Sequence, residues 1–392
     1  MSLTMKASME LRKFVVPEVV VGSEASLLIG RYLTHFGSKK AMVVTDRKVQ
    51  EQHWFHQIIQ SISEVGIEVY VFDEATSNPK DFEVMMGAEL FLANDCDVIV
   101  AVGGGSPMDC AKGIGIVSTN GGHVLDYVGV DEIRLPGPPL ICIPTTAGSS
   151  ADVSQFAIIG DSLAQVKKAI ISKKVVPDLA LIDPIPLTTM DSYLTACTGI
   201  DALTHAIEAC VSNARSDLTH VHALSAIGLI HEHLEQAVQP NRSMETLQSV
   251  MMASLHAGFA FSNASLGAVH AMAHSLGGLM DLPHGECNGI LLEKVMEANF
   301  ESAEAMYRMI AGEMGIEAAK MSREEVKAAL LHRIDALRHS IGIPDYFPAD
   351  PVSDKQMDLL TASALKDPCM VTNPKTLNKK EVKDIYEFLF QQ

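Results

Sequence analysis

Five side chains that can bind a metal ion or carry a proton occur at regular spacing in the second half of the sequence. Asp201 and His205 are four residues apart, and so are His270 and His274. Residues at this spacing lie on one face of a helix, where a carboxylate and an imidazole can reach the same ion. The fifth, His284, stands in a Pro-His-Gly sequence that predicts a tight turn. The pattern predicts one metal site built by two helices and a turn.

The donor set indicates the kind of ion. One carboxylate with several imidazoles, on a mostly apolar background, suits Fe²⁺, Zn²⁺, Co²⁺ or Ni²⁺. Ca²⁺ and Mg²⁺ prefer oxygen ligands and fit poorly. A lone histidine is more often a hydrogen-bonded core residue, but two pairs at the same spacing favour a metal site. The remaining helical histidines lack such partners, and we interpret them as structural or surface residues: His220, His222, His231, His233 and His256.

A glycine-rich segment in the first half predicts an anion-binding turn. The apolar run 97–102 leads into Gly103–Ser106, and a helical pattern carrying Asp109 and Lys112 follows. Such a turn exposes backbone N–H groups at a helix N-terminus, where hydrogen bonds and the helix dipole favour a pyrophosphate. The spacing matches neither the G-x-G-x-x-G fingerprint nor a P-loop. A purely structural turn is the alternative, although the apolar strand before the glycines favours the phosphate site.

Asp46 follows another expected strand and has two interpretations. Its carboxylate could accept hydrogen bonds from a ribose 2′-OH and repel a 2′-phosphate. It could also cap the N-terminus of the following helix. The sequence pattern does not decide between these two roles.

These candidates require a framework of alternating strands and helices. Short apolar runs alternate with longer amphipathic stretches in the first half, as in βαβ units around a parallel sheet. We expect strands at 41–45, 68–72, 97–102 and 140–144, and helices at 26–36, 51–65 and 81–94. Since the carboxyl ends of parallel strands share one edge, residues 45–46, 103–106 and 145–146 should meet in one crevice.

The second half has a different pattern. After the proline-containing segment 182–186 the strand signal ends, and helical patterns follow with turns expected at Asn213, 240–241, 277–278 and 342–344. We therefore predict two domains. Residues 1–185 form an α/β dinucleotide-binding domain with a Rossmann-like parallel sheet, and residues 186–392 form an all-α metal-binding domain.

Composition excludes several classes of partner. Of 392 residues, 47% are hydrophobic and 20% are charged, and the formal net charge is −18. This acidic balance argues against nucleic acid, which requires clustered Lys and Arg. No signal-peptide pattern and no apolar run long enough for a membrane span is found. Seven scattered cysteines without a CxxC pair are typical of reduced thiols, so we expect a cytoplasmic protein.

Taken together, the motifs resemble those of a known enzyme family. They comprise Gly103–Ser106 with Asp109 and Lys112, Pro-Thr-Thr-Ala-Gly at 144–148, Asp201 with His205, the segment 267–274 and the Pro-His-Gly sequence at 283–285. This combination spans nearly the whole chain and is similar to that of the iron-containing (group III) alcohol dehydrogenases. The resemblance implies a dinucleotide-binding domain followed by an all-helical metal domain, a fold of the dehydroquinate synthase type.

The resemblance also implies roles for individual residues. Asp201, His205, His270 and His284 would bind the metal, and His274 beside it would relay a proton or contact substrate. The positions that would bind the cofactor form a larger set: Asp46, Asn78, Gly103, Gly104, Gly105, Ser106, Asp109, Thr145, Thr146 and Lys167. Phe261 and Cys369 match regions that line the substrate pocket.

One loop departs from the family pattern. Where the family usually continues Gly-Thr-Gly-Ser-Glu-Val, this chain has Gly-Ser-Ser-Ala-Asp-Val at 148–153. A glycine is lost, and Glu is shortened to Asp, close to the expected nicotinamide position. We therefore expect altered cofactor contacts in this loop.

The activity that the resemblance implies is hydride transfer between NAD(H) and a small primary alcohol or diol, or its aldehyde. Fe²⁺, or Zn²⁺ or another divalent transition metal, would polarise the substrate oxygen. Asp46 favours NAD over NADP, and we expect a homodimer or higher homo-oligomer. A hydroxyacid–oxoacid transhydrogenase-like enzyme with tightly bound cofactor is one alternative. A non-catalytic metal- or nucleotide-binding homologue is the other. A dehydroquinate synthase reaction fits less well, because the segment 201–284 is poor in Lys and Arg.

Overall fold

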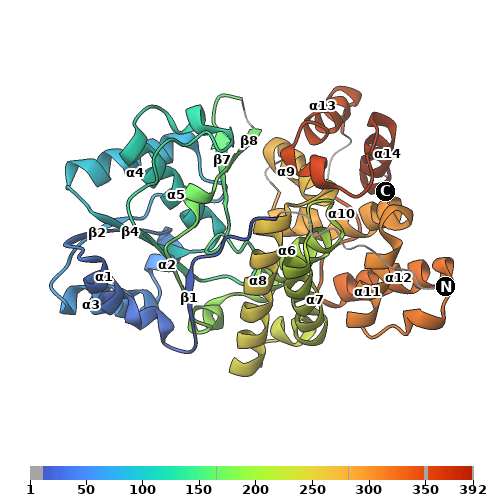
Figure 1. The fold of residues 1–392 in the computed structure, drawn as a ribbon, viewed down its shortest axis with the longest axis horizontal. Helices are drawn as coiled ribbons and strands as arrows, with labels where there is room; N and C mark the ends of the chain where they lie inside the picture. The colour runs from blue at the N-terminus through green and yellow to red at the C-terminus, as the bar shows by residue number, and fades with distance from the viewer. Residues whose placement is uncertain (1–11, 165, 281, 348–351, 391–392) are drawn as a thin grey trace.

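Two parts of different architecture lie side by side in the computed structural model, an α/β part and a helical part (Figure 1). The structure describes residues 12–164, 166–280, 282–347 and 352–390. Strands and helices alternate up to residue 182, and helices follow from there on. This is the fold class that the sequence predicts.

A parallel sheet with strand order β1-β9-β6-β4-β2-β3 forms the centre of the α/β part. Its strands are β1 (Glu18–Val21), β2 (Lys40–Val44), β3 (Glu68–Phe72), β4 (Val98–Gly103), β6 (Leu140–Pro144) and β9 (Leu179–Ile182). Strands β4 and β6 are buried along their whole length. A parallel strand covered on both faces requires such a continuous apolar run.

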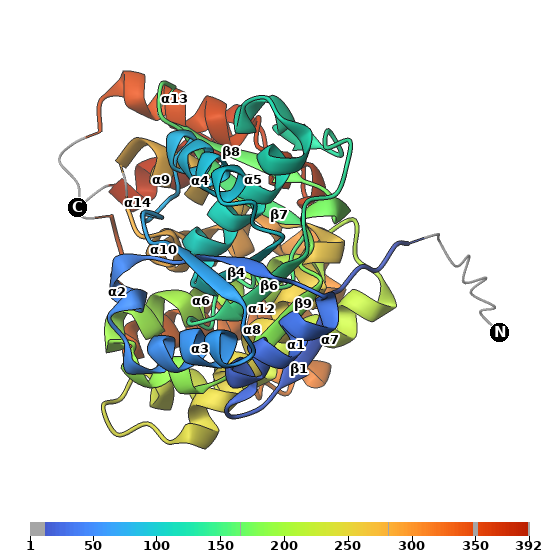
Figure 2. The same cartoon turned by 90° about the vertical axis from the view of Figure 1, so that its left-hand side faces the viewer.

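Helices cover both faces of this sheet (Figure 2). Val98 and Val100 of β4 pack with α1 (Ile29–Phe36) and α3 (His53–Glu64). Ile99 and Ala101 pack on the other face with α4 (Asp81–Ala93) and α5 (Gly105–Asn120). Since side chains alternate along a strand, a run that is apolar at every position forms the core on both faces.

A second, smaller sheet was not expected. Strands β7 (Phe156–Asp161) and β8 (Val166–Ile171) pair antiparallel, and β5 (Gly129–Val130) adds to β8 in parallel. Two lysines interrupt the apolar pattern of β8, so its strand signal is weak. This sheet packs against α9 of the helical part, and it carries Lys167 there.

The helical part is a bundle around one continuous core. Its helices are α6 (Ser192–Val211), α7 (Asp217–Ala237), α8 (Met244–Ala264), α9 (Ala268–Met280), α10 (His284–Asn299), α11 (Glu304–Glu313), α12 (Arg323–Ser340), α13 (Asp354–Ala364) and α14 (Lys379–Phe390). A short helix, α2 (Arg47–Gln50), follows β2, and 3₁₀ turns occur at Ala25–Leu28, Val124–Tyr127, Lys173–Val175, Ile185–Thr189, Phe300–Ala303, Ala318–Lys320 and Pro368–Thr372. Helix α6 is buried at most of its positions, which suits a central helix.

Two of the expected turns are wrong. Helix α9 continues through 277–278 to Met280, because glycine permits a helix to end without requiring it. Gly277 instead makes room for a neighbour, since a Cβ there would lie 2.9 Å from Lys167 Nζ. His284 begins helix α10 with Pro283 as its N-cap. Gly285 lets α10 approach α6, because a Cβ would lie 2.0 Å from the Cys197 carbonyl oxygen. The turns expected at Asn213, 240–241 and 342–344 do separate helices.

None of the helices in the described ranges combines the length and the apolar character that a membrane span needs. All seven cysteines are buried and unpaired.

Candidate metal centre and nucleotide loop

Helix α6 presents three polar side chains from one buried face. Asp201, His205 and Glu208 follow one another at intervals of four and three residues, and each is nearly inaccessible to solvent. This spacing places them along a single stripe of the helix. The helix is fixed at its start by Asp191, whose carboxylate caps the backbone N–H of Leu194 at 2.7 Å.

Imidazoles from three helices converge on Asp201. Its Oδ1 atom lies 3.6 Å from His270 Nε2, 3.8 Å from His284 Nε2 and 3.9 Å from His205 Nε2. The donor atoms of Asp201, His270 and His284 all lie within 4.8 Å of one another. The structure therefore brings the four expected ligands together.

The environment of these donors fits a divalent cation. Asn288, one turn after His284 on α10, donates to Asp201 Oδ1 at 2.7 Å, and its Nδ2 lies 3.1 Å from His270 Nε2 and 3.2 Å from His284 Nε2. A hydrogen-bond donor thus lies where three ligand atoms converge. Asn288 Oδ1 is buried without a hydrogen-bond partner among the described residues. A donor set of imidazoles and one carboxylate around a centre that attracts positive charge suits Fe²⁺ or Zn²⁺.

The pKa shifts of these four residues agree with a centre that attracts positive charge. Burial alone would raise the pKa of Asp201, but His205, His284 and His270 hold it well below its usual range. Burial lowers the pKa of His205 to about 3 and that of His284 well below its ordinary value. For His270, hydrogen bonds to Asp201 and Glu208 overcome burial and raise the pKa to about 9. His205 and His284 can thus offer neutral imidazole nitrogens to an ion. The carboxylates of Asp201 and Glu208 both face His270.

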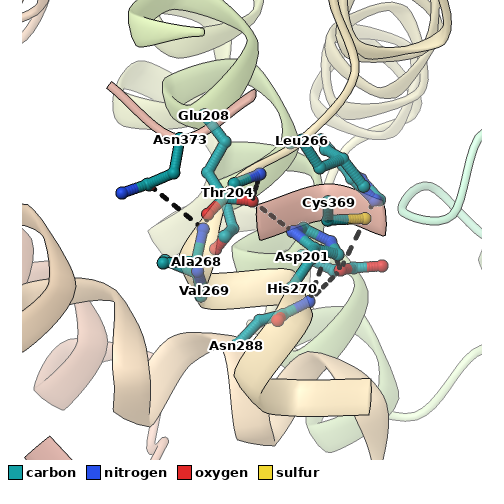
Figure 3. A network of polar contacts seen from close by, with 12 residues as sticks. Asp201, Thr204, Glu208, Leu266, Ala268, Val269, His270, Asn288, Cys369 and Asn373 are labelled. Carbon is teal, nitrogen blue, oxygen red and sulfur yellow. Dashed lines mark hydrogen bonds and ion pairs between the residues drawn. The ribbon is translucent and has the colours of Figure 1, made fainter. Parts of the chain in front are cut away.

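Glu208 belongs to this network although the sequence analysis gave it no role. Its Oε2 atom lies 2.7 Å from His270 Nδ1, on the side of the ring away from Asp201 (Figure 3). Its place on the Asp201 face of α6 was the available signal. Asn288, four residues after His284, offered a similar signal.

His274 lies beside the cluster and is held by a partner distant in sequence. Its Nδ1 atom lies 2.9 Å from Asp367 Oδ2, and its ring stacks on His284 with a centroid separation of 5.4 Å. Asp367 also accepts a hydrogen bond from the backbone N–H of Cys369 at 2.8 Å. No local spacing connects residues 274 and 367, so Asp367 could not be found from the sequence. The side chains of His274 and His284, 12% and 29% exposed, mark the accessible side of the cluster.

The two expected substrate-pocket residues lie next to these histidines. The Phe261 ring stacks on His205 at a centroid separation of 4.2 Å and is buried. Cys369 is also buried, and its Sγ atom lies within 4.8 Å of donor atoms of His274 and Asp367. Their role toward a substrate stays a prediction.

The glycine loop forms the second half of the site. Gly103 ends β4, Gly104 is the N-cap of α5, and Gly105 is the first residue of that helix. A Cβ on Gly104 would lie 3.2 Å from Thr146, and one on Gly105 would lie 2.9 Å from Ser149. Side chains are therefore excluded by close packing, and backbone N–H groups begin a sixteen-residue helix. This is the geometry of a phosphate-binding helix N-terminus.

Neighbouring residues of the expected cofactor set support this loop. Ser106 Oγ accepts a hydrogen bond from the backbone of Asn78 at 3.3 Å, and Asn78 adopts a left-handed φ of 57°. The backbone N–H of Thr145 donates to the Gly103 carbonyl at 2.9 Å. Asp109 accepts from the backbone of Ile158 at 3.1 Å, and burial raises its pKa to about 6. Asp109 thus fastens α5 to β7.

Asp46 is an N-cap in the structure. Its Oδ1 atom accepts a hydrogen bond from the backbone of Val49 at 3.0 Å, at the start of α2. It lies two residues after Val44, the last residue of β2, and β2 pairs with β4, so it lies at the same sheet edge as Gly103. The contact with a ribose stays a prediction beside this capping role.

Lys167 lies between the two parts. It belongs to β8, and its ammonium group approaches Gly277 of α9. Its positive charge adds to the effect of burial in lowering the pKa of His284 and partly opposes the burial that raises the pKa of Asp109. The cofactor position implied by the resemblance is therefore next to the histidine cluster in space.

The loop that departs from the family pattern joins the two parts. Ser150 has a left-handed φ of 50°, and its hydroxyl donates to the Ser254 carbonyl of α8 at 2.7 Å. Lys112 Nζ holds the following residues by donating to the carbonyls of Ser154 and Phe156 at 3.1 and 2.7 Å. The hydrogen bond of the Ser150 side chain offsets part of the cost of this left-handed backbone conformation.

Comparison with known proteins identifies the family. Residues 17–184 match the model of iron-containing alcohol dehydrogenase, and residues 195–390 match that of the Fe-containing alcohol dehydrogenase family, C-terminal. The chain is 37% identical over 380 residues to 1,3-propanediol dehydrogenase of Citrobacter freundii, covering 96% of this chain and 98% of that protein. It is 33% identical over 372 residues to the NAD-dependent methanol dehydrogenase of Bacillus methanolicus, covering 95% and 98%. A crystal structure of 1,3-propanediol oxidoreductase superposes with a TM-score of 0.94 at 36% identity, covering 97% of this chain and 100% of that chain. The chain therefore belongs to the iron-containing alcohol dehydrogenase family of oxidoreductases.

Proposed function

We propose that this protein is an NAD(H)-dependent dehydrogenase of small primary alcohols or diols that uses one divalent transition metal, Fe²⁺ in the first place. The observation that carries the proposal is the convergence of three imidazoles from three helices on one buried carboxylate, Asp201. Similar proteins named 1,3-propanediol dehydrogenase and NAD-dependent methanol dehydrogenase support the alcohol class and the nicotinamide cofactor.

Each half of the site has one task in this reaction. When bound, the divalent ion supplies positive charge that lowers the pKa of a substrate hydroxyl, and NAD supplies the hydride acceptor. Asp201, His205, His270 and His284 hold the ion, and the loop at Gly103–Ser106 binds the pyrophosphate.

His274 exchanges the substrate's proton. Because Asp367 holds Nδ1 of this ring at 2.9 Å, the Nε2 atom is the one that meets a substrate hydroxyl. A histidine whose ring is oriented by a carboxylate is suited to proton transfer near neutral pH. Phe261 and Cys369, both buried, narrow the substrate side and limit water there.

The proposal also covers the coenzyme preference, the cellular compartment and the partners of the enzyme. The carboxylate of Asp46 at the end of β2 favours NAD over NADP, because a 2′-phosphate would meet a like charge. Seven unpaired cysteines support a reducing compartment such as the cytoplasm. We expect a homodimer or higher homo-oligomer with no nucleic-acid partner, the latter in keeping with the net charge of −18.

The direct test combines metal content with turnover. Protein purified without oxygen is analysed for bound metals, and NADH formation is followed with short primary alcohols and diols, for wild type and His270→Ala. We expect one divalent ion per chain and alcohol-dependent NADH formation in the wild type, with both lost in the variant. A wild type that binds no metal and ignores every alcohol would overturn the proposal.

A further inference from the structure

The carboxylate of Glu208 takes part in three hydrogen bonds, and these indicate which atom donates to it from His270. Its Oε1 atom accepts from the backbone N–H of Val269 at 2.7 Å, and Oε2 accepts from the backbone N–H of Gly267 at 3.0 Å. Oε2 also lies 2.7 Å from His270 Nδ1. An ionised carboxylate can only accept, so His270 Nδ1 is the donor in the third contact.

This arrangement determines which nitrogen of His270 can bind a metal. With Nδ1 held by Glu208, Nε2 is the atom left to face an ion, and it lies 3.6 Å from Asp201 Oδ1. A carboxylate at the far nitrogen also increases the electron density of the ring and prevents its rotation. The hydrogen bond to Glu208 thus determines both the orientation of the His270 ring and its tautomer.

The same carboxylate fixes the start of the helix that carries His270. The N–H groups of Gly267 and Val269 precede and begin α9, and an acceptor with negative charge there stabilises a helix N-terminus. Asn373 assists by accepting from Ala268 N at 3.1 Å (Figure 3). Asn373 in turn donates a hydrogen bond to Asn299. Glu208 therefore sets both the backbone position and the ring orientation of one histidine.

His284 shows the contrast. Its Nδ1 atom is buried without a hydrogen-bond partner among the described residues. His205 is located by stacking, between Phe261 at 4.2 Å and His270 at 4.4 Å. The His205 ring thus packs on the His270 ring, so a displacement of His270 would also displace His205.

We propose that Glu208 is the positioning residue of the metal centre, which orients His270 by accepting its Nδ1–H and thereby aligns the neighbouring ligands. The inference rests on the proposed function for the existence of the metal. Removing the Glu208 acceptor weakens metal binding although Glu208 itself does not touch the ion.

The test compares two buried glutamates that cap helices. Glu208→Gln keeps the size of the side chain but turns one acceptor into an N–H₂ donor that faces N–H groups. The control is Glu83→Gln, because Glu83 is also buried and accepts from the backbone of Thr76 at 3.2 Å and of Lys80 at 3.1 Å. Both changes replace one of two carboxylate oxygens at a helix start by a donor, and only Glu208 contacts an expected metal ligand.

We measure the Zn²⁺ dissociation constant and the rate of Zn²⁺ loss to a chelator, starting from the metal-loaded full chain. Glu208→Gln is expected to weaken binding about 10- to 100-fold, the usual effect of losing an outer partner of a ligating histidine. Glu83→Gln is expected to lower thermal stability with wild-type Zn²⁺ binding. Glu208→Asp, which keeps the charge, should bind more tightly than Glu208→Gln. The absorption bands of the Co²⁺-substituted protein should shift in Glu208→Gln alone.

Unchanged Zn²⁺ binding in a folded Glu208→Gln variant would overturn the inference, as would equal weakening in Glu83→Gln. A wild type without any Zn²⁺ affinity would instead overturn the proposed function. Should Glu208→Gln not fold, the wild type still decides the matter: with ¹⁵N-labelled histidine and bound Zn²⁺, NMR should show an exchange-protected Nδ1–H that disappears in His270→Gln. A deprotonated Nδ1 on His270 would contradict the inference.

Discussion

The histidine cluster and the glycine loop place their chemistry in opposite ways. At the cluster, side-chain atoms of Asp201, His270 and His284 meet, although their helices are separated in sequence. At the loop, the proposed phosphate contacts come from backbone N–H groups. Gly104 and Gly105 carry no side chain there, and an added Cβ would crowd Thr146 or Ser149. The cluster is therefore sensitive to atoms removed, and the loop to atoms added.

The largest effect should come from removing charge at the cluster. Asp201→Asn keeps the shape of the side chain, but it takes away the one negative charge toward which the three imidazoles point. Metal affinity should fall by more than about 100-fold, since losing even an outer partner costs about 10- to 100-fold. NAD binding, measured by fluorescence titration, should stay at the wild-type level. Loss of both would mean that the two regions are one cooperative unit.

Adding atoms to the loop should give the reverse result. In Gly105→Val, the new Cβ would begin 2.9 Å from Ser149, so the glycine loop or Ser149 must shift. We expect the dissociation constant of NAD to rise about 100-fold, or about 2.7 kcal/mol. The metal content should remain one ion per chain. An undiminished NAD affinity would show that the phosphates bind elsewhere.

A smaller effect is expected at the edge of the cluster. Asp367→Asn keeps a hydrogen-bonding group near His274 Nδ1 but no longer forces that nitrogen to be the donor. We expect kcat to fall about 10-fold, a part of the roughly 10²- to 10⁴-fold that a positioned acid–base group contributes. Metal content should be unchanged, and KM should change little. Steady-state kinetics with one alcohol substrate measures this, and an unaltered kcat would remove Asp367 from the mechanism.

The smallest effect separates the two roles of Asp46. Asp46→Ala removes the cap of α2 and should destabilise the fold by about 1 kcal/mol. Asp46→Ser keeps a capping oxygen and should leave the thermal midpoint unchanged. Both variants lose the carboxylate, so the preference for NAD over NADP should decrease in both alike. Equal coenzyme selectivity in wild type and Asp46→Ser would leave capping as the function of this residue.

Much of the fold follows from local sequence pattern. The strands at 68–72 and 140–144 are found at the expected positions, and the neighbouring helices differ by one to three residues at their ends. The confirmed resemblance extends this to the order of the two parts. Strand β8 was missed because two lysines interrupt its apolar pattern, and pairing with β7 and contact with α9 stabilise it instead. The apolar run that begins β7 was an available signal.

The candidate site also contains residues that local sequence pattern predicts and residues that it does not. Asp201, His205 and His270 were predictable as candidate ligands because helical spacing puts each pair of donors on one face, and the family resemblance distinguished His270 from His274. The wrong turn at 277–278 shows the limit of this reasoning, since the glycine there serves the approach of Lys167. Asp367 could not be predicted, because only the folded chain brings it to His274.

The contribution of three separate helices to one cluster has a consequence for folding. Residues 201, 270 and 284 come together only in the folded chain, so a cation with affinity for the cluster binds the native state more tightly than the unfolded chain. By mass action such an ion adds about 2.7 kcal/mol to the free energy of unfolding at a hundred times its dissociation constant. With the proposed metal, the stability of the helical part would increase with the free metal concentration, and a chelator would remove this added stability.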